Sequence, residues 1–155
     1  KTLESGFMSV VQCIFNIFHQ RPITELFPVA YKLDIGIIAC VPFDEGGLTG
    51  NINQSTTFKN DDFRSKYFAG NRLRELVRRT DKLKLLVGRE AKSLPELALR
   101  YILSYPTLAS VIPGMRKIKN IEENMAVADG KKLSRNVLKS LSHQTWERNF
   151  YPWAV

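Results

Sequence analysis

The chain has 155 residues, of which 44% are hydrophobic and 25% are charged, and its net charge is +8. This composition is typical of a folded globular protein and excludes a disordered chain. The positive charge is compatible with nucleic acid, an anionic membrane surface or a phosphate-bearing ligand, and it does not choose among them.

The two cysteines, Cys13 and Cys40, each lie in an apolar run, and two are too few for a disulfide scaffold. We therefore expect free thiols and a reducing compartment, the cytoplasm. No run approaches the ~20 apolar residues that span a bilayer, and the N-terminus, KTLESGFMSV, lacks the layout of a signal peptide. The chain does not begin with Met, and we expect it to be a fragment.

The first predicted elements are two strands with a helix between them. Residues 9–18 (SVVQCIFNIF) and 35–41 (IGIIACV) are continuous apolar runs rich in β-branched residues, which predict strands buried on both faces. Between them, Thr24 is expected to cap a helix that ends near residues 34–36. A long loop from residue 42 to about 70 follows.

Two helices and a third strand are predicted next. The first helix carries six basic residues mostly outside its apolar stripe, and we interpret that charge run as a solvated face. The second begins at SLPE, residues 93–96, which has capping-box spacing, and should end before Pro106. Residues 108–112 (LASVI) predict the third strand. The stripe of the first helix consists of Leu73, Leu76, Val77, Thr80 and Leu83.

Two shorter helices are predicted after the third strand. The first should direct Ile118, Ile121 and Met125 inward, and the second should be capped by Ser134.

This alternation of strands and helices predicts parallel strands joined by right-handed crossovers. Three strands make a poor independent sheet, and their continuous apolar runs demand neighbours on both edges. The sequence therefore indicates a piece of a larger α/β structure, either an open doubly wound sheet or a (β/α)8 barrel. A whole barrel typically needs about 250 residues.

Functional loops lie at the carboxyl ends of the strands in both architectures. Residues 40–51 (CVPFDEGGLTGN) hold three glycines that would let backbone N–H groups approach an anion, and a flexible turn is the alternative. Residues 111–124 (VIPGMRKIKNIEEN) place Arg116 and Lys117 before a helix, where acids are normally preferred. A bound phosphate would explain these cations, and a solvated basic turn is the alternative.

Other polar residues are less informative. Gln12 lies in an apolar strand, where its amide would bond either another buried group or an amide of a ligand. His19 and His143 belong to no cluster with metal-ligand spacing, so no metal site is predicted.

Four stretches, in order, resemble the C-terminal part of a bacterial aldo-keto reductase: VVQCIFNIFHQRP, LFPVAYKLDIGIIACVPFDEGGLTGN, DDFRSKYF and SLPELALRYILSYPTLASVIPGMRKIKNIEENMAVADGKKLS. The most specific element is I-P-G-x-R followed by E-N. The resemblance implies an α/β fold, a (β/α)8 TIM barrel that binds NADPH without a Rossmann fold. Residues 1–155 would be the C-terminal portion of that single domain, with strands six to eight of the barrel and the C-terminal helices.

The resemblance also implies a cofactor site. The Gln of a Q-x-x-x-N strand would bind the nicotinamide carboxamide, and the next strand would end in a residue that packs on the nicotinamide, usually an aromatic or Arg and here a Cys. Residues 41–50 would line the pyrophosphate, the I-P-G-x-R motif would hold the adenosine 2′-phosphate, and the helix after it would approach the adenine. The expected cofactor-binding residues are Gln12, Cys40, Val41, Pro42, Phe43, Gly46, Gly50, Arg64, Gly114, Met115, Arg116, Asn120, Glu123 and Asn124.

The resemblance places the catalytic Asp, Tyr, Lys and His in the first half of the barrel, so no catalytic residue is expected in this chain. The complete protein would reduce small carbonyl substrates with NADPH, and the isolated chain should show little turnover. The alternative is a truncated, non-catalytic nucleotide-binding or interaction module, completed by self-association or by another chain. Nucleic-acid binding through the basic residues 72–84 rests on charge alone, and we expect neither nucleic acid nor a membrane as partner.

Overall fold

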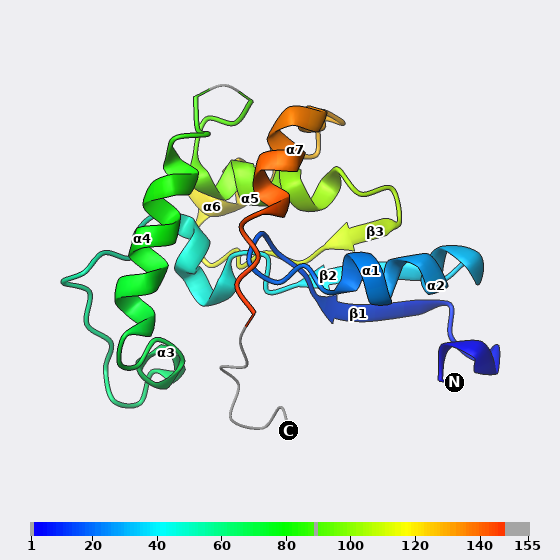
Figure 1. Ribbon diagram of the computed structural model, residues 1–155, viewed down its shortest axis with the longest axis horizontal. Helices are drawn as coiled ribbons and strands as arrows, with labels where there is room; N and C mark the ends of the chain where they lie inside the picture. The colour runs from blue at the N-terminus through cyan, green and yellow to red at the C-terminus, as the bar shows by residue number, and fades with distance from the viewer. Residues whose placement is uncertain (1, 89, 148–155) are drawn as a thin grey trace.

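The computed structural model describes residues 2–88 and 90–147. Its β-sheet contains β1 (Val10–Ile14), β2 (Gly36–Cys40) and β3 (Leu108–Val111) in the order β1-β2-β3, and both neighbouring pairs are parallel (Figure 1). The α/β class and the three parallel strands are therefore confirmed. The first strand is shorter than expected, because the chain leaves the sheet after Ile14.

Helices connect and follow these strands. A short 3-10 helix, η1, precedes the sheet, and a second, η2, directly follows β2. The bounds are η1 (Leu3–Ser5), α1 (Pro22–Glu25), α2 (Phe27–Lys32), η2 (Asp44–Thr49), α3 (Phe63–Tyr67), α4 (Arg72–Lys84), α5 (Leu94–Leu103), α6 (Ile118–Met125) and α7 (Arg135–Ser142).

The segment that connects β1 to β2 differs from the single helix capped by Thr24 that the sequence predicts. It consists of α1 and α2 with a break at Leu26, and Thr24 lies inside α1, where its hydroxyl donates to the Arg21 carbonyl at 3.2 Å. Pro28 explains the break, because it has no backbone N–H to donate to the carbonyl four residues earlier.

The later helices follow the sequence pattern closely. Ser93 caps α5 by accepting from the Glu96 N–H at 3.3 Å, and Ser134 caps α7 by accepting from the Val137 N–H at 3.4 Å. The predicted stripe of α4 is turned to the core, where Leu76 and Leu83 are fully buried. Of the described helices, not one is both long and apolar enough to cross a bilayer.

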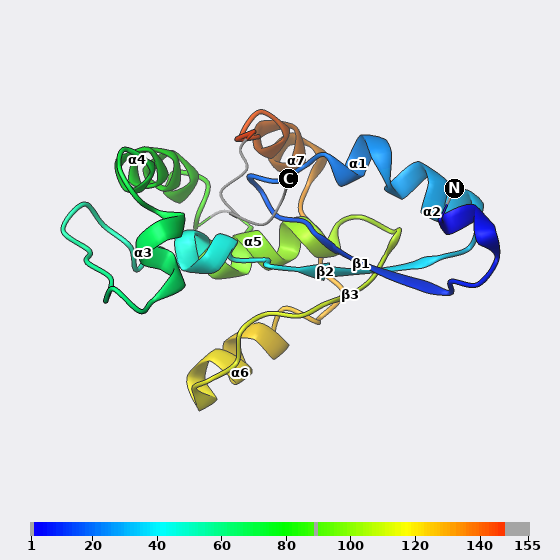
Figure 2. The same ribbon diagram turned by 90° about the horizontal axis from the view of Figure 1, so that it is seen from below.

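Helix α6 contradicts the expectation that its apolar residues point inward. Ile118 is 76% exposed, Met125 is 65% exposed, and only Ile121 is half-buried. Figure 2 shows the reason: α6 lies on the opposite side of the sheet from α1, α2 and α7, so these helices cannot cover it.

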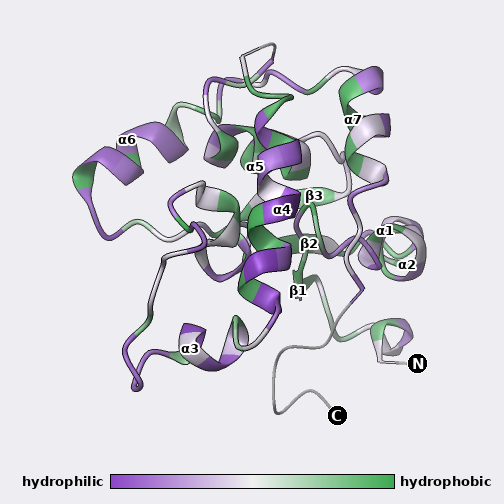
Figure 3. Ribbon diagram, turned by 60° about the vertical axis from the view of Figure 1, so that its left-hand side comes forward, coloured by the Kyte–Doolittle hydropathy of each residue, from purple (hydrophilic) through white to green (hydrophobic). Residues whose placement is uncertain are grey.

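The core lies on one face of the sheet. Ile37 and Ala39 of β2 are fully buried there, together with Phe15 and Tyr101, whose rings stack with centroids 5.5 Å apart. In Figure 3 the strands carry the green of hydrophobic residues, and purple residues mark the outer helices α4 and α6.

The other face of the sheet is open in the described part of the chain. Val10 is 52% exposed, Gln12 and Ser110 are exposed, and Ile38 and Cys40 are half-buried. The expectation that the strands are buried on both faces is therefore wrong for this chain, because the described helices that pack on the sheet cover one face only.

Candidate functional site

The carboxyl ends of β2 and β3 open into a cleft of about 730 Å³. Its walls come mainly from three segments that are distant in the sequence: the loop after β2, the long loop with the start of α3, and the turn after β3 with α6. Pro95 of α5 also lines it. Ten of the fourteen expected residues line it: Val41, Pro42, Phe43, Gly46, Arg64, Gly114, Arg116, Asn120, Glu123 and Asn124.

The remaining four expected residues lie outside the lining of this cleft. Gln12 and Cys40 sit on the open face of the sheet, where Gln12 is exposed and not buried as expected. Burial raises the pKa of the Cys40 thiol, and a hydrogen bond with the Gln12 side chain partly opposes that rise, so the two side chains are neighbours. Met115 is exposed, and Gly50 packs near Leu94 at the start of α5.

The loop after β2 has a strained backbone. Val41, Asp44 and Glu45 have φ angles of 53°, 50° and 55°, and Gly46 has 96°. A left-handed conformation is unusual for any residue other than glycine and is a marked outlier for a β-branched one such as Val41. Strain of this kind costs about 1–3 kcal/mol per residue and concentrates at ligand-binding sites.

Asn16, two residues beyond the end of β1, supports this strained loop. Its side chain is 1% exposed, and its Nδ2 donates to the Val41 carbonyl at 2.9 Å, while its Oδ1 accepts from the N–H groups of Phe18 and His19, each at 2.9 Å. No supporting role for this residue was predicted. The available signal was its place as the Asn of the Q-x-x-x-N pattern at the end of an apolar run.

Packing also fixes the glycine-rich helix η2. Asp44 is buried and accepts a hydrogen bond from the Tyr67 hydroxyl at 2.9 Å, which ties the loop to α3. A Cβ on Gly47 would lie 2.8 Å from Leu76 Cδ1, so a larger residue there would force the buried Leu76 side chain to shift. Gly47 therefore serves packing, whereas the neighbouring Gly46 lines the cleft.

Arg64 is oriented within the cleft by its neighbours. Its Nε and Nη2 donate to the Asp62 carboxylate at 2.6–3.1 Å, and its guanidinium lies 4.9 Å from the centroid of the Phe58 ring. These bonds lower the pKa of Asp62 to about 2, with a further contribution from the charge of Arg116. The Nη1 atom is turned toward Gly46, where a Cβ would lie 3.9 Å from it.

The turn between β3 and α6 adds a second cation at an open helix end. Arg116 is exposed and lines the cleft, and Lys117, the N-cap residue of α6, makes no capping bond with its side chain to any described residue. The N–H groups and the positive dipole end of a helix favour an anion at this position. Asn124 Nδ2 donates to the Gly114 carbonyl at 3.3 Å and so joins the helix to the turn.

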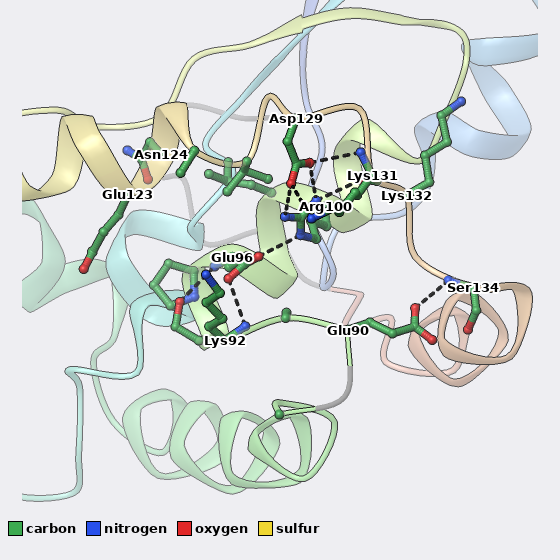
Figure 4. Close-up of a pocket in the computed structure, with 17 residues that line it drawn as sticks. Glu90, Lys92, Glu96, Arg100, Glu123, Asn124, Asp129, Lys131, Lys132 and Ser134 are labelled. Atoms are coloured by element: carbon green, nitrogen blue, oxygen red, sulfur yellow. Dashed lines mark hydrogen bonds and ion pairs between the residues drawn. The ribbon is translucent and has the colours of Figure 1, made fainter.

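A larger cleft, of about 930 Å³, lies on the other side of α6. Its most buried cation, Arg100, is already paired with Glu96 and Asp129 (Figure 4). The cleft at the strand ends is therefore the better candidate for a ligand, because Arg116 is exposed there and the Arg64 side chain, although paired with Asp62, is 39% exposed, whereas that of Arg100 is 6% exposed. Within residues 2–88 and 90–147, no group of three or more His, Cys, Asp or Glu side chains could hold a metal ion.

Three comparisons relate the chain to known proteins. A profile described as the Aldo/keto reductase family matches residues 5–143. The chain is 30% identical over 133 residues to the protein named "Uncharacterized oxidoreductase YqkF" of Bacillus subtilis (strain 168), covering 84% of this chain and 41% of that protein. It is 23% identical over 124 residues to the NADH-specific methylglyoxal reductase of Escherichia coli (strain K12), covering 80% and 38%.

The fold is similar to that of the glycerol dehydrogenase AKR11B4 from Gluconobacter oxydans, with a TM-score of 0.78 and 24% sequence identity over 87% of this chain and 41% of that one. The chain thus spans about two fifths of the length of these relatives, at 41% and 38% of the two curated proteins. Because the family profile extends over most of the sequence, the chain belongs to the aldo/keto reductase family.

Proposed function

We propose that the chain is the cofactor-binding part of a carbonyl reductase, and that its cleft takes the pyrophosphate and adenosine of NADPH. Aldo-keto reductases use nicotinamide cofactors. The observation that carries the proposal is the gathering of ten residues from three distant segments into one cleft that contains two arginines, Arg64 and Arg116.

The two ends of the dinucleotide would occupy different parts of the molecule. The strained loop and Arg64 would hold the pyrophosphate, since backbone N–H groups suit phosphate oxygens and the Arg64 Nη1 atom, a charged donor, is turned toward Gly46. The nicotinamide would lie over the open face of the sheet, beside Gln12 and Cys40, which are neighbours there.

The open face of the sheet supports a further part of the proposal. A parallel sheet covered by helices on one side only, with half-buried Ile38 and exposed Val10 on the other, has the form of a wall of a (β/α)8 barrel. The strands would be the sixth to eighth of that barrel, and the acid-base residues would come from its remaining strands. The isolated chain should therefore reduce aldehydes very slowly, even with NADPH bound.

The choice between NADPH and NADH would depend on Arg116, which lies just before the amino end of α6 and would bind the 2′-phosphate. Arg116→Ala should weaken NADPH binding by about 10- to 100-fold, the effect of losing hydrogen bonds to a charged group. NADH lacks the 2′-phosphate, so its affinity should change little.

The experiment is a calorimetric titration of the 155-residue chain with NADPH and with NADH. Arg135→Ala is the matched control, because it removes the same exposed charge at the start of α7, outside the cleft. Failure of the unmodified chain to bind either dinucleotide would refute the proposed site. Equal losses for both dinucleotides in Arg116→Ala would refute the role of Arg116.

A further inference from the structure

Arg100 is a buried cation that lies outside the proposed cofactor cleft. It belongs to α5, is 5% exposed, and makes four hydrogen bonds. Its Nε donates to Glu96 Oε1 at 2.8 Å, and its Nη1 donates to the Lys131 carbonyl at 3.0 Å. Its Nη1 and Nη2 also form a fork with the two carboxylate oxygens of Asp129, at 2.9 and 3.1 Å (Figure 4).

This fork joins two segments that are distant in the sequence. Asp129 lies on the turn just after α6, whereas Arg100 is inside α5. Bidentate bonding between guanidinium and carboxylate fixes both distance and direction, which a single point charge does not. The Arg100 guanidinium holds the pKa of Asp129 well below its usual range, so both groups remain charged near neutral pH.

Packing of α6 itself does little to hold the helix in place. None of its described side chains is buried, and Ile118 and Met125 are largely exposed. The helix is held instead near its carboxyl end: Asn124 bonds the Gly114 turn, and beyond the last helical residue Val127 is buried and Asp129 is paired with Arg100.

Helix α6 also separates the two clefts. Glu123 and Asn124 line both of them, and Asn120 lines the proposed cofactor cleft. A tilt of α6 would therefore move these side chains relative to the Gly114 turn and change the walls of both clefts.

We propose that the Arg100–Asp129 pair is a latch that fixes α6 against α5 and thereby sets the width of the adenosine end of the cofactor cleft. Arg100 and Asp129 are then positioning residues that touch no part of the ligand. The effect on affinity rests on the proposed function, whereas the effect on α6 rests on the contacts alone.

The test combines two variants with one control. Asp129→Asn keeps the shape of the side chain and removes its charge, and Arg100→Lys keeps the charge and removes the fork. Lys131→Ala is the matched control, because its ammonium lies 3.4 Å from the same Asp129 carboxylate but is exposed and forms no fork. Its backbone carbonyl, which Arg100 binds, remains in place.

Hydrogen exchange measures the latch directly. In Asp129→Asn and Arg100→Lys, amides of α6 should exchange at least about tenfold faster, as expected for a local opening, while amides of β2 should stay unchanged. The control should match the unmodified chain. In the double variant, the amides of α6 should exchange no faster than in the more severe single variant, because the two residues act as one pair.

Affinity measures the consequence. NADPH and 2′,5′-ADP, which carries only the adenosine end, should both bind more weakly by the same factor, about 2- to 30-fold, the range for residues that act without touching a ligand. Unchanged exchange of α6 in both variants would overturn the latch, whatever NADPH does. Faster exchange with unaltered affinity for 2′,5′-ADP would overturn the claim that the latch sets the cleft. If the unmodified chain binds neither ligand, the proposed function and the claim on affinity fail together, and the exchange result still decides the latch.

Discussion

Asn16 offers the sharpest test of how the candidate site is supported. The substitution Asn16→Ala would remove three hydrogen bonds of 2.9 Å from a side chain that is 1% exposed. Two of them satisfy the N–H groups of Phe18 and His19 as the chain turns out of β1. The third holds the carbonyl of the strained Val41. Each neutral hydrogen bond contributes about 1 kcal/mol net, so the free energy of unfolding should fall by about 3 kcal/mol.

The assay is urea denaturation followed by circular dichroism, with thermal unfolding beside it. For a chain of this size the midpoint temperature should fall by roughly 6–12 °C. Asn60→Ala is the control, because Asn60 is an exposed loop residue whose loss should change stability by no more than about 0.5 kcal/mol. If the two variants were equally stable, the buried amide would not be the support of the loop.

Two further predictions concern the same region. Gly47→Ala should lower the free energy of unfolding by about 1–3 kcal/mol, because the new Cβ would lie 2.8 Å from Leu76 Cδ1. Gly114→Ala is the control: its new Cβ would have no atom within 4 Å, so the urea midpoint should stay unchanged. The pKa of Asp62 is lowered from its ordinary value of 3.8 to about 2 in the folded chain. Its pairing with Arg64 therefore stabilises the folded chain fully at pH values above 3.8, and this stabilisation is lost as the pH falls toward 2. Urea titrations of the unmodified chain and of Asp62→Asn should therefore differ in the free energy of unfolding. This difference should be constant from about pH 7 to 5 and should shrink below about pH 4. A difference that persisted at about pH 2 would contradict the pairing.

Local signals in the sequence correctly predict an element when the residues of that element alone determine where it begins. Ser93 and Ser134 cap their helices because a side-chain oxygen followed by a helical run needs no tertiary partner to define the start. The Pro-Gly turn with Arg116 likewise places a cation beside a helix end through chain connectivity alone. Ten of the fourteen expected residues meet in one cleft for a related reason, since parallel strands bring their carboxyl ends to the same edge.

Expectations failed where the outcome depends on what lies opposite a residue. The apolar stripe of α6 and the apolar run of β1 both predict burial, yet Ile118 and Val10 are exposed, because no described element covers them. Gln12 was expected to be buried for the same reason and is exposed. An apolar pattern indicates that a side chain favours burial, but it does not indicate which other segment buries it.

The loop after β2 combines a strained backbone with hydrogen bonds from distant side chains that stabilise it. Positive φ angles at Val41, Asp44 and Glu45 would relax in an isolated peptide, because each costs about 1–3 kcal/mol. They persist here because Asn16 holds the Val41 carbonyl from one side and Tyr67 holds the Asp44 carboxylate from the other. Both supports come from outside the glycine-rich stretch, so the stretch alone does not define a binding loop. A glycine-rich turn therefore becomes a candidate phosphate site in this chain only when distant buried polar side chains fix its backbone.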